Sequence, residues 1–133
     1  MKIYDSKYKS VEFNEEEALM ITKWNPTSKE LVESTFKEQI KIWLNEVLSL
    51  KPTKLLIDTT DFQFILEPDV QDWFDREVFS AYPKAGVQKK AFLHSVDYVA
   101  QVSLEQHTHE IQNSTFDVAF FATKEEALEW LLS

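Results

Sequence analysis

The chain has 133 residues, of which 23 are acidic and 14 are basic, so its formal net charge is −9 at pH 7. This length is typical of a single domain with an ordinary hydrophobic core, and we expect one domain over residues 1–133. A strongly negative protein is repelled by nucleic acid phosphates and by anionic membrane surfaces. Neither is therefore an expected partner.

Other function classes are excluded by what the chain lacks. No apolar run approaches the ~20 residues needed to span a bilayer, and the first residues do not resemble a secretion signal. Membrane insertion is not expected, and the cytoplasm is the default location. Without cysteine there is no thiolate nucleophile or Cys-based metal site. The single glycine, Gly86, cannot supply a phosphate-binding loop or a nucleophile elbow. We therefore expect no cofactor and no enzyme activity.

The chain opens with the pattern of a β-hairpin. Val11 and Phe13 alternate with polar residues, as in a strand that is buried on one face. Residues 14–17 are polar and predict a turn, and residues 18–24 are predicted to return as the second strand.

A long helix is predicted next. Thr27 and Glu30 have the spacing of a capping box, which would place the start of the helix at this point. Apolar residues then recur at helical spacing as far as Leu48. The Lys51–Pro52 pair is predicted to end the helix.

The rest of the chain alternates strands with helices. Apolar runs typical of strands that are buried on both faces occupy residues 54–58, 89–95 and 117–122. Helices are predicted over residues 68–78, 96–112 and 124–132, and Thr123 with Glu126 forms a second capping box. Strands joined by helices run parallel. The prediction is an α/β fold with a mixed sheet of four to five strands.

Four short motifs follow one another in this pattern: LLIDTT at 55–60, QDW at 71–73, KKAF at 89–92 and FFATKEEALEWL at 120–131. Together with the order of the elements, they resemble the STAS superfamily, specifically its SpoIIAA-like branch of small bacterial stand-alone domains. The resemblance covers residues 11–132 and implies a regulatory or protein-interaction module rather than an enzyme.

One departure from the STAS pattern concerns regulation. In that family a phosphorylatable serine lies in an Asp-Ser-x-Gly motif, at the start of the helix that follows the strand matching residues 55–58. The corresponding residues here are LEPDV at 66–70, which include neither a hydroxyl group nor a glycine. We therefore do not expect the kinase-regulated switch of the family.

The most acidic stretch, residues 58–77, has a local charge of −6. One interpretation is that this stretch binds a hard cation such as Mg²⁺, because ligands bind beyond the carboxyl ends of strands in open α/β sheets. Carboxylates also favour the first turns of helices, where they meet the positive end of the dipole. We favour this structural interpretation and predict no metal site. The acidic candidates are Asp58, Asp61, Asp69 and Asp72.

His107 and His109 are a second candidate for metal binding. Two residues apart, they would share a face of a strand but diverge on a helix. The helix predicted over residues 96–112 therefore favours a solvated polar face.

Four aromatic residues lie where polar loop residues are expected: Phe62, Phe64, Trp73 and Phe74. They indicate either a contact surface, for a protein partner or for a second copy of the chain in a homodimer, or the wall of an apolar pocket. Packing of the rings over the sheet is the structural alternative.

Lys84, Lys89 and Lys90 surround Gly86 and suggest a small basic patch. It could meet an acidic partner surface, or it could protect a sheet edge from aggregation.

The first functional hypothesis is a non-catalytic interaction or regulatory module, cytoplasmic and homodimeric. The alternative is a domain that binds a small apolar ligand or a lipid. A metal-dependent enzyme that uses Asp58 and Asp61 is more remote.

Overall fold

The computed structural model describes residues 1–64, 67–93 and 117–133, so the helix predicted over 96–112, with His107 and His109, lies outside the described residues. The described strands are β1 (Lys2–Asp5), β2 (Lys9–Asn14), β3 (Leu19–Trp24), β4 (Lys54–Asp58), β5 (Lys89–Leu93) and β6 (Asp117–Phe121). The described α-helices are α1 (Glu33–Leu50), α2 (Pro68–Glu77), α3 (Tyr82–Ala85) and α5 (Lys124–Leu131). Two short 3₁₀ segments are η1 (Pro26–Glu30) and η2 (Phe79–Ala81).

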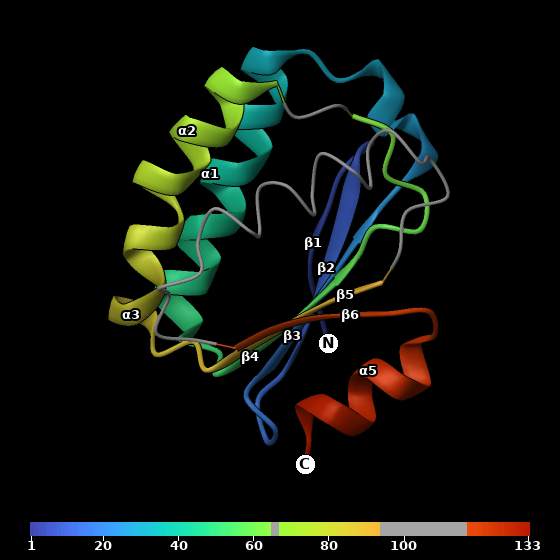
Figure 1. Cartoon of the computed structure of the whole chain (residues 1–133), viewed down its shortest axis with the longest axis vertical. Helices are drawn as coiled ribbons and strands as arrows, with labels where there is room; N and C mark the ends of the chain where they lie inside the picture. Colours follow the sequence, from blue (N-terminus) through green and yellow to red (C-terminus); the bar gives the residue numbers. More distant parts are fainter. Residues whose placement is uncertain (65–66, 94–116) are drawn as a thin grey trace.

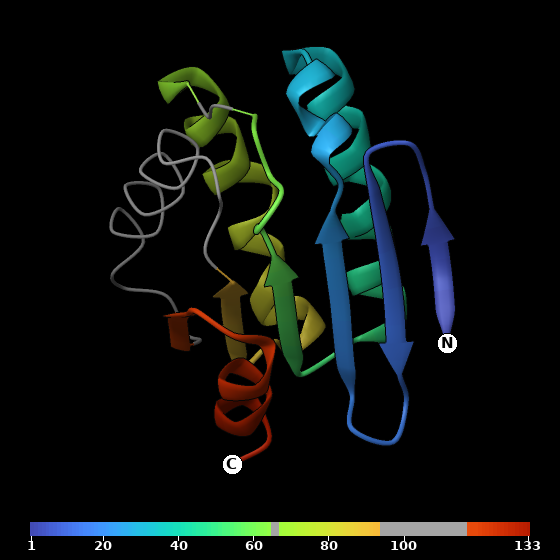
Figure 2. The same ribbon diagram turned by 90° about the vertical axis from the view of Figure 1, so that its right-hand side faces the viewer.

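The strands form one mixed sheet whose spatial order follows the chain from β1 to β6 (Figure 2). β1, β2 and β3 pair antiparallel, and β3 to β6 pair parallel. Helices α1, α2 and α3 lie on one face of the sheet, and α5 lies on the other (Figure 1). The predicted α/β class with a mixed sheet is confirmed. The predicted count of four to five strands was too low, because β1 was not recognised in a four-residue segment.

The predicted hairpin is present as β2 and β3, which pair from Lys9 with Trp24 to Asn14 with Leu19. Its turn ends at Ala18, which adopts a left-handed conformation with φ 51°. The carbonyl of Ala18 accepts hydrogen bonds from the amides of Thr53, at 3.0 Å, and of Lys54, at 3.1 Å. The hairpin turn is thereby connected to the start of β4.

The long helix begins later than the sequence predicted. The capping box at Thr27 was wrong, because the Thr27 hydroxyl donates a hydrogen bond to the carbonyl of Lys7. Residues Pro26–Glu30 form η1 instead, and α1 begins at Glu33. There the Val32 amide donates to the Thr35 hydroxyl at 3.0 Å.

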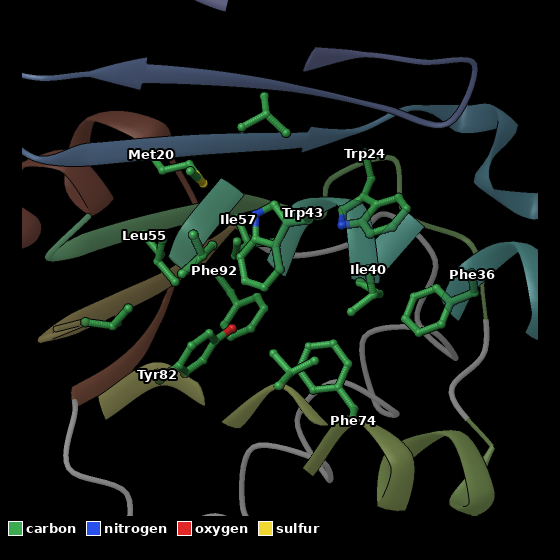
Figure 3. Packing of buried hydrophobic residues seen from close by; sticks show 14 of the residues in the cluster. Met20, Trp24, Phe36, Ile40, Trp43, Leu55, Ile57, Phe74, Tyr82 and Phe92 are labelled. Atoms are coloured by element: carbon green, nitrogen blue, oxygen red, sulfur yellow. The ribbon is translucent and has the colours of Figure 1, made fainter. Parts of the chain in front are cut away.

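Two hydrophobic cores lie on opposite faces of the sheet. Because side chains alternate along a strand, Leu55 and Ile57 enter the larger core under α1 to α3, whereas Leu56 enters the smaller core under α5. Continuous apolar runs such as β4 result from this arrangement, since both faces of the strand are covered. Figure 3 shows the larger core, with many of its rings directed toward one another.

The later elements agree with the sequence, with one addition. α2 has Pro68 in its first turn, as predicted. Thr123 caps α5 by accepting a hydrogen bond from the Glu126 amide at 3.2 Å. Helix α3 was not predicted, and it brings the fully buried Tyr82 into the larger core. Among the described helices, none is long and apolar enough to cross a membrane.

Candidate functional site

A cavity of about 50 Å³ lies in the larger core, between the sheet and helices α1 and α2. Its walls include two lysines, Lys9 and Lys90, and two threonines, Thr22 and Thr59. The aromatic residues on its walls are Trp24, Phe36, Trp43, Phe62, Phe74 and Phe92. An aromatic cavity with a few polar groups is the usual form of a small-molecule site.

The strand register explains how residues far apart in the sequence meet in this cavity. Thr22 on β3 is paired with Ile57 on β4, and Ile57 is paired with Phe92 on β5. Lys90 lies on β5, two residues before Phe92. Lys9 lies on β2 and is paired with Trp24 on β3. All of these side chains project from the same face of the sheet, toward α1. Lys9 on β2 and Lys90 on β5 therefore border the cavity from the two strands that flank β3 and β4.

Lys9 is a fully buried cation in this cavity. Its Nζ donates a hydrogen bond of 2.8 Å to the backbone carbonyl of Gln39. The same atom lies 5.6 Å from the ring centroid of Tyr4, 5.5 Å from that of Trp24 and 5.9 Å from that of Trp43. In the described ranges no carboxylate lies within ion-pair distance of Lys9. Burial lowers the pKa of Lys9 to about 7, and the charge of Glu46 opposes this shift.

Lys90 is 2 % exposed and lies in a similar aromatic environment. Its Nζ donates a hydrogen bond of 2.8 Å to the hydroxyl of Tyr82. The ring centroids of Phe92 and Phe74 lie 4.9 and 5.5 Å from this atom. Burial lowers the pKa of Lys90 to about 7. Burial also raises the pKa of Tyr82 well above its usual value, so the phenol stays protonated.

Trp43 lies near both lysines. Their Nζ atoms are 5.9 and 5.8 Å from its ring centroid, so these atoms are at most about 12 Å apart. The indole N–H of Trp43 donates a hydrogen bond of 2.9 Å to the hydroxyl of Thr22, and both residues are buried. This bond fixes the ring that both lysine Nζ atoms approach. Figure 3 shows Trp43 at the centre of the core, facing Phe92 and Tyr82.

Glu46 is the acidic residue whose charge acts on Lys9. It follows Gln39 and Trp43 along the face of α1 that is turned to the sheet, at spacings of seven and three residues. Its Oε2 atom is buried and has no hydrogen-bond partner among the described residues. Burial raises the pKa of Glu46, and the positive charge of Lys9 lowers it. The carboxyl group is therefore easier to protonate than an exposed glutamate.

The structure divides the four predicted aromatic residues between different sites. Phe62 and Phe74 line the cavity together. Phe64 stacks on Phe36 with 4.7 Å between ring centroids, and it borders an outer groove of about 330 Å³. Trp73 is half-buried, with the Nζ of Lys37 5.4 Å from its ring centroid. Phe62 and Phe74 therefore line an apolar pocket, which was one of the alternatives predicted for the four residues.

The acidic candidates do not form a single site. Asp58 borders a hollow of about 90 Å³ on the α5 face of the sheet, together with Lys23 and Lys124. Its Oδ1 accepts a hydrogen bond of 3.0 Å from the Thr60 amide.

The other three acidic candidates lie elsewhere. Asp61 is half-buried, and its carbonyl accepts a hydrogen bond of 3.3 Å from Ser28. Asp69 and Asp72 are exposed on α2, on the opposite face of the sheet from the hollow at Asp58. No group of three His, Asp or Glu side chains that could hold a metal ion occurs in the described part of the chain.

The predicted basic patch was wrong, because β5 directs consecutive lysines to opposite faces. Lys89 donates a hydrogen bond of 2.9 Å to the carbonyl of Trp130 at α5, whereas Lys90 enters the cavity. Lys84 is exposed on α3. The roles of Lys9 and Lys90 as buried residues were not predicted from the sequence.

Comparison of the chain with protein-family models, with curated proteins and with solved structures finds no match. The resemblance to the STAS superfamily therefore stays a prediction. The geometry of the cavity is what bears on function.

Proposed function

We propose that the protein binds a small organic acid in the cavity that Lys9 and Lys90 share. The apolar part of the ligand contacts the aromatic walls, and its carboxylate meets the lysine side chains. The observation that carries this proposal is the presence of two buried lysines on the wall of one aromatic cavity. It deepens the predicted alternative of a domain that binds a small apolar ligand.

Electrostatics favours an anionic group on the ligand. A buried ammonium is costly unless its charge is balanced and its donors are used. Lys9 has three N–H donors when it is protonated, and one of them is used by the carbonyl of Gln39. Glu46 acts on this amine from beyond ion-pair distance, and the rings around its Nζ attract a cation by on the order of 1–2 kcal/mol. A carboxylate bonded to this amine would favour the protonated form and would gain a charge-assisted hydrogen bond.

The size of the cavity limits the ligand to a few atoms. Its volume of about 50 Å³ is well below the ~150 Å³ of a cavity that admits benzene. Acids of two to four carbons are therefore the best candidates.

The interaction module of the STAS type, the homodimer and the cytoplasmic location remain predictions. The cavity does not support the interaction surface as it was first defined, because Phe62 and Phe74 are buried and face inward.

Thermal melting and isothermal titration with propionate test the proposal, with propionamide as the neutral control of the same shape. We expect propionate to raise the melting temperature and propionamide to have little effect. Lys9→Met and Lys90→Met should each weaken propionate binding, whereas Lys41→Met, at an exposed position on α1, should not. Equal binding of the amide and the acid, or no binding of any short acid, would contradict the proposal.

A further inference from the structure

We propose that Lys9 captures small oxo acids covalently, its amine forming an imine with a ligand carbonyl that lies next to the carboxylate. This inference rests on the proposed organic-acid site. It adds an activity, because the ligand would be bound by a reversible carbon–nitrogen bond and not by contacts alone.

The position of the Lys9 amine suits this reaction. The side chain extends from β2 into the cavity wall, and its Nζ lies near the rings of Trp24 and Trp43, which line the same cavity. The hydrogen bond to the carbonyl of Gln39 takes one N–H at 2.8 Å and fixes the direction of the amine. In a neutral amine the lone pair then remains available to a ligand in the cavity.

The second lysine, Lys90, is placed to meet the carboxylate of an oxo acid. Lys90 borders the same cavity, and its Nζ lies 5.8 Å from the Trp43 ring centroid, against 5.9 Å for the Nζ of Lys9. A carboxylate directed toward Lys90 would leave the adjacent carbonyl toward Lys9. Burial of Lys9 in this apolar site disfavours its protonated form, which is a known way of activating a lysine nucleophile.

The protonation state of Lys9 also supports its role as the nucleophile. The pKa of Lys9 is lowered to about 7, so about half of its amine is neutral at pH 7. An exposed lysine with an ordinary pKa has a neutral fraction about a thousandfold lower at this pH. The charged or titratable groups that face Lys9 from the described elements are Tyr4 on β1, Glu46 on α1 and Lys90 on β5.

The reaction balances without an oxidant or a reductant. The Nζ lone pair of the neutral amine forms a bond to the carbonyl carbon as the carbonyl π bond breaks, and one proton moves from the nitrogen to the carbonyl oxygen to give a carbinolamine. The carbinolamine hydroxyl then takes up a second proton and leaves as water, while the nitrogen lone pair forms the carbon–nitrogen double bond of a protonated imine. Hydrolysis by water reverses both steps, so the ligand can be released unchanged.

Reductive trapping with pyruvate and sodium cyanoborohydride, followed by peptide mapping in a mass spectrometer, tests the inference. At pH 7 we expect one main adduct, on Lys9, with a trapping rate that rises with pH around a midpoint of about 7. Lys9→Met and Lys9→Arg should abolish this adduct; Arg keeps the positive charge but cannot act as the nucleophile. Lys41→Met should trap pyruvate as the wild-type protein does. Mapping of the wild-type protein identifies the adduct even if a Lys9 variant does not fold.

Propionate, which has no ketone, separates this inference from the organic-acid site. If propionate binds but pyruvate is not trapped, or is trapped mainly on Lys90 or on exposed lysines, covalent capture by Lys9 is overturned and the binding site remains. If neither acid binds, the organic-acid site fails, and the inference fails with it.

Discussion

Lys90 donates a hydrogen bond of 2.8 Å to the hydroxyl of Tyr82, and both side chains are buried where α3 packs against the sheet. Their pKa values shift in opposite directions, the lysine downward and the tyrosine upward, because burial disfavours the charged form of each. Both groups are therefore more nearly neutral than they would be at the surface. This pair makes the stability of the fold sensitive to pH.

The first prediction concerns that sensitivity. The pKa of Lys90 is about 7 in the folded chain and that of an ordinary lysine is 10.5, so between these values the unfolded chain holds the additional proton. Lys90 alone should then make the free energy of unfolding rise with pH across this window, by up to about 1.4 kcal/mol per pH unit. Lys90→Met should flatten this rise, which urea denaturation at several values between pH 6.5 and 9.5 would measure.

Lys9→Met should flatten the rise in a similar way, because the pKa of Lys9 is also about 7. The exposed Lys41→Met is the matched control and should follow the wild-type curve. Curves for Lys90→Met and the wild type that stay parallel over the whole range would show that Lys90 keeps an ordinary pKa in the folded protein.

The second prediction concerns the hydrogen bond between Trp43 and Thr22. Thr22→Val keeps the shape of the side chain but removes the acceptor, so the buried indole N–H loses its 2.9 Å partner. We expect a loss of about 1–3 kcal/mol in the free energy of unfolding, measured by urea denaturation. In a Trp43→Phe background the same substitution should cost much less, because no indole N–H remains. An equal loss of unfolding free energy for Thr22→Val in the wild type and in Trp43→Phe would contradict a stabilising hydrogen bond between these residues.

The third prediction concerns the cap of α5. The Thr123 hydroxyl accepts a hydrogen bond of 3.2 Å from the Glu126 amide. Thr123→Ala should reduce stability by about 1 kcal/mol, whereas Thr123→Ser, which keeps the acceptor, should stay close to the wild type. Thermal melting of the three proteins measures the difference, and an alanine variant as stable as the serine variant would contradict it.

The fourth prediction concerns the turn before β3. Ala18 has φ 51°, a left-handed conformation in which its Cβ approaches the backbone. Ala18→Gly should increase stability by about 0.5–1 kcal/mol, and Ala18→Val should reduce it, because a β-branched side chain fits this conformation poorly. Chemical denaturation would test both, and a glycine variant less stable than the wild type would show that the larger freedom of the unfolded chain outweighs the strain.

Much of the fold could be predicted, because its signals are local. Alternation in the hairpin and apolar runs such as residues 54–58 depend only on which faces of a strand are covered. The start of α1 could not be predicted, because the capping hydroxyl of Thr27 is engaged by Lys7, a contact that only the folded chain creates.

The cavity was harder to predict than the fold. Lys9 has the same phase as the inward-facing Val11, which is a signal in the sequence, but a charged residue at the end of a strand normally indicates exposure. On β5, Lys89 and Lys90 are indistinguishable by periodicity, because both faces of that strand are buried. Their tertiary contacts distinguish the two, since Lys90 meets Tyr82 on α3 and Lys89 meets the carbonyl of Trp130 on α5. The aromatic residues Phe62 and Phe74 were identified, but the two cations beside them were not.

The order of the strands has a consequence for biosynthesis. Because the sheet order follows the chain order, each strand after β2 docks on a strand that has already been made, and the sheet grows at one edge as the chain leaves the ribosome. Lys9 is synthesised with the first hairpin and loses contact with water only when α1 packs over it. Lys90 arrives with β5 and completes the cavity wall. Lys9 can therefore lose its proton to water until α1 packs over it, whereas Lys90 can do so until β5 docks in the sheet.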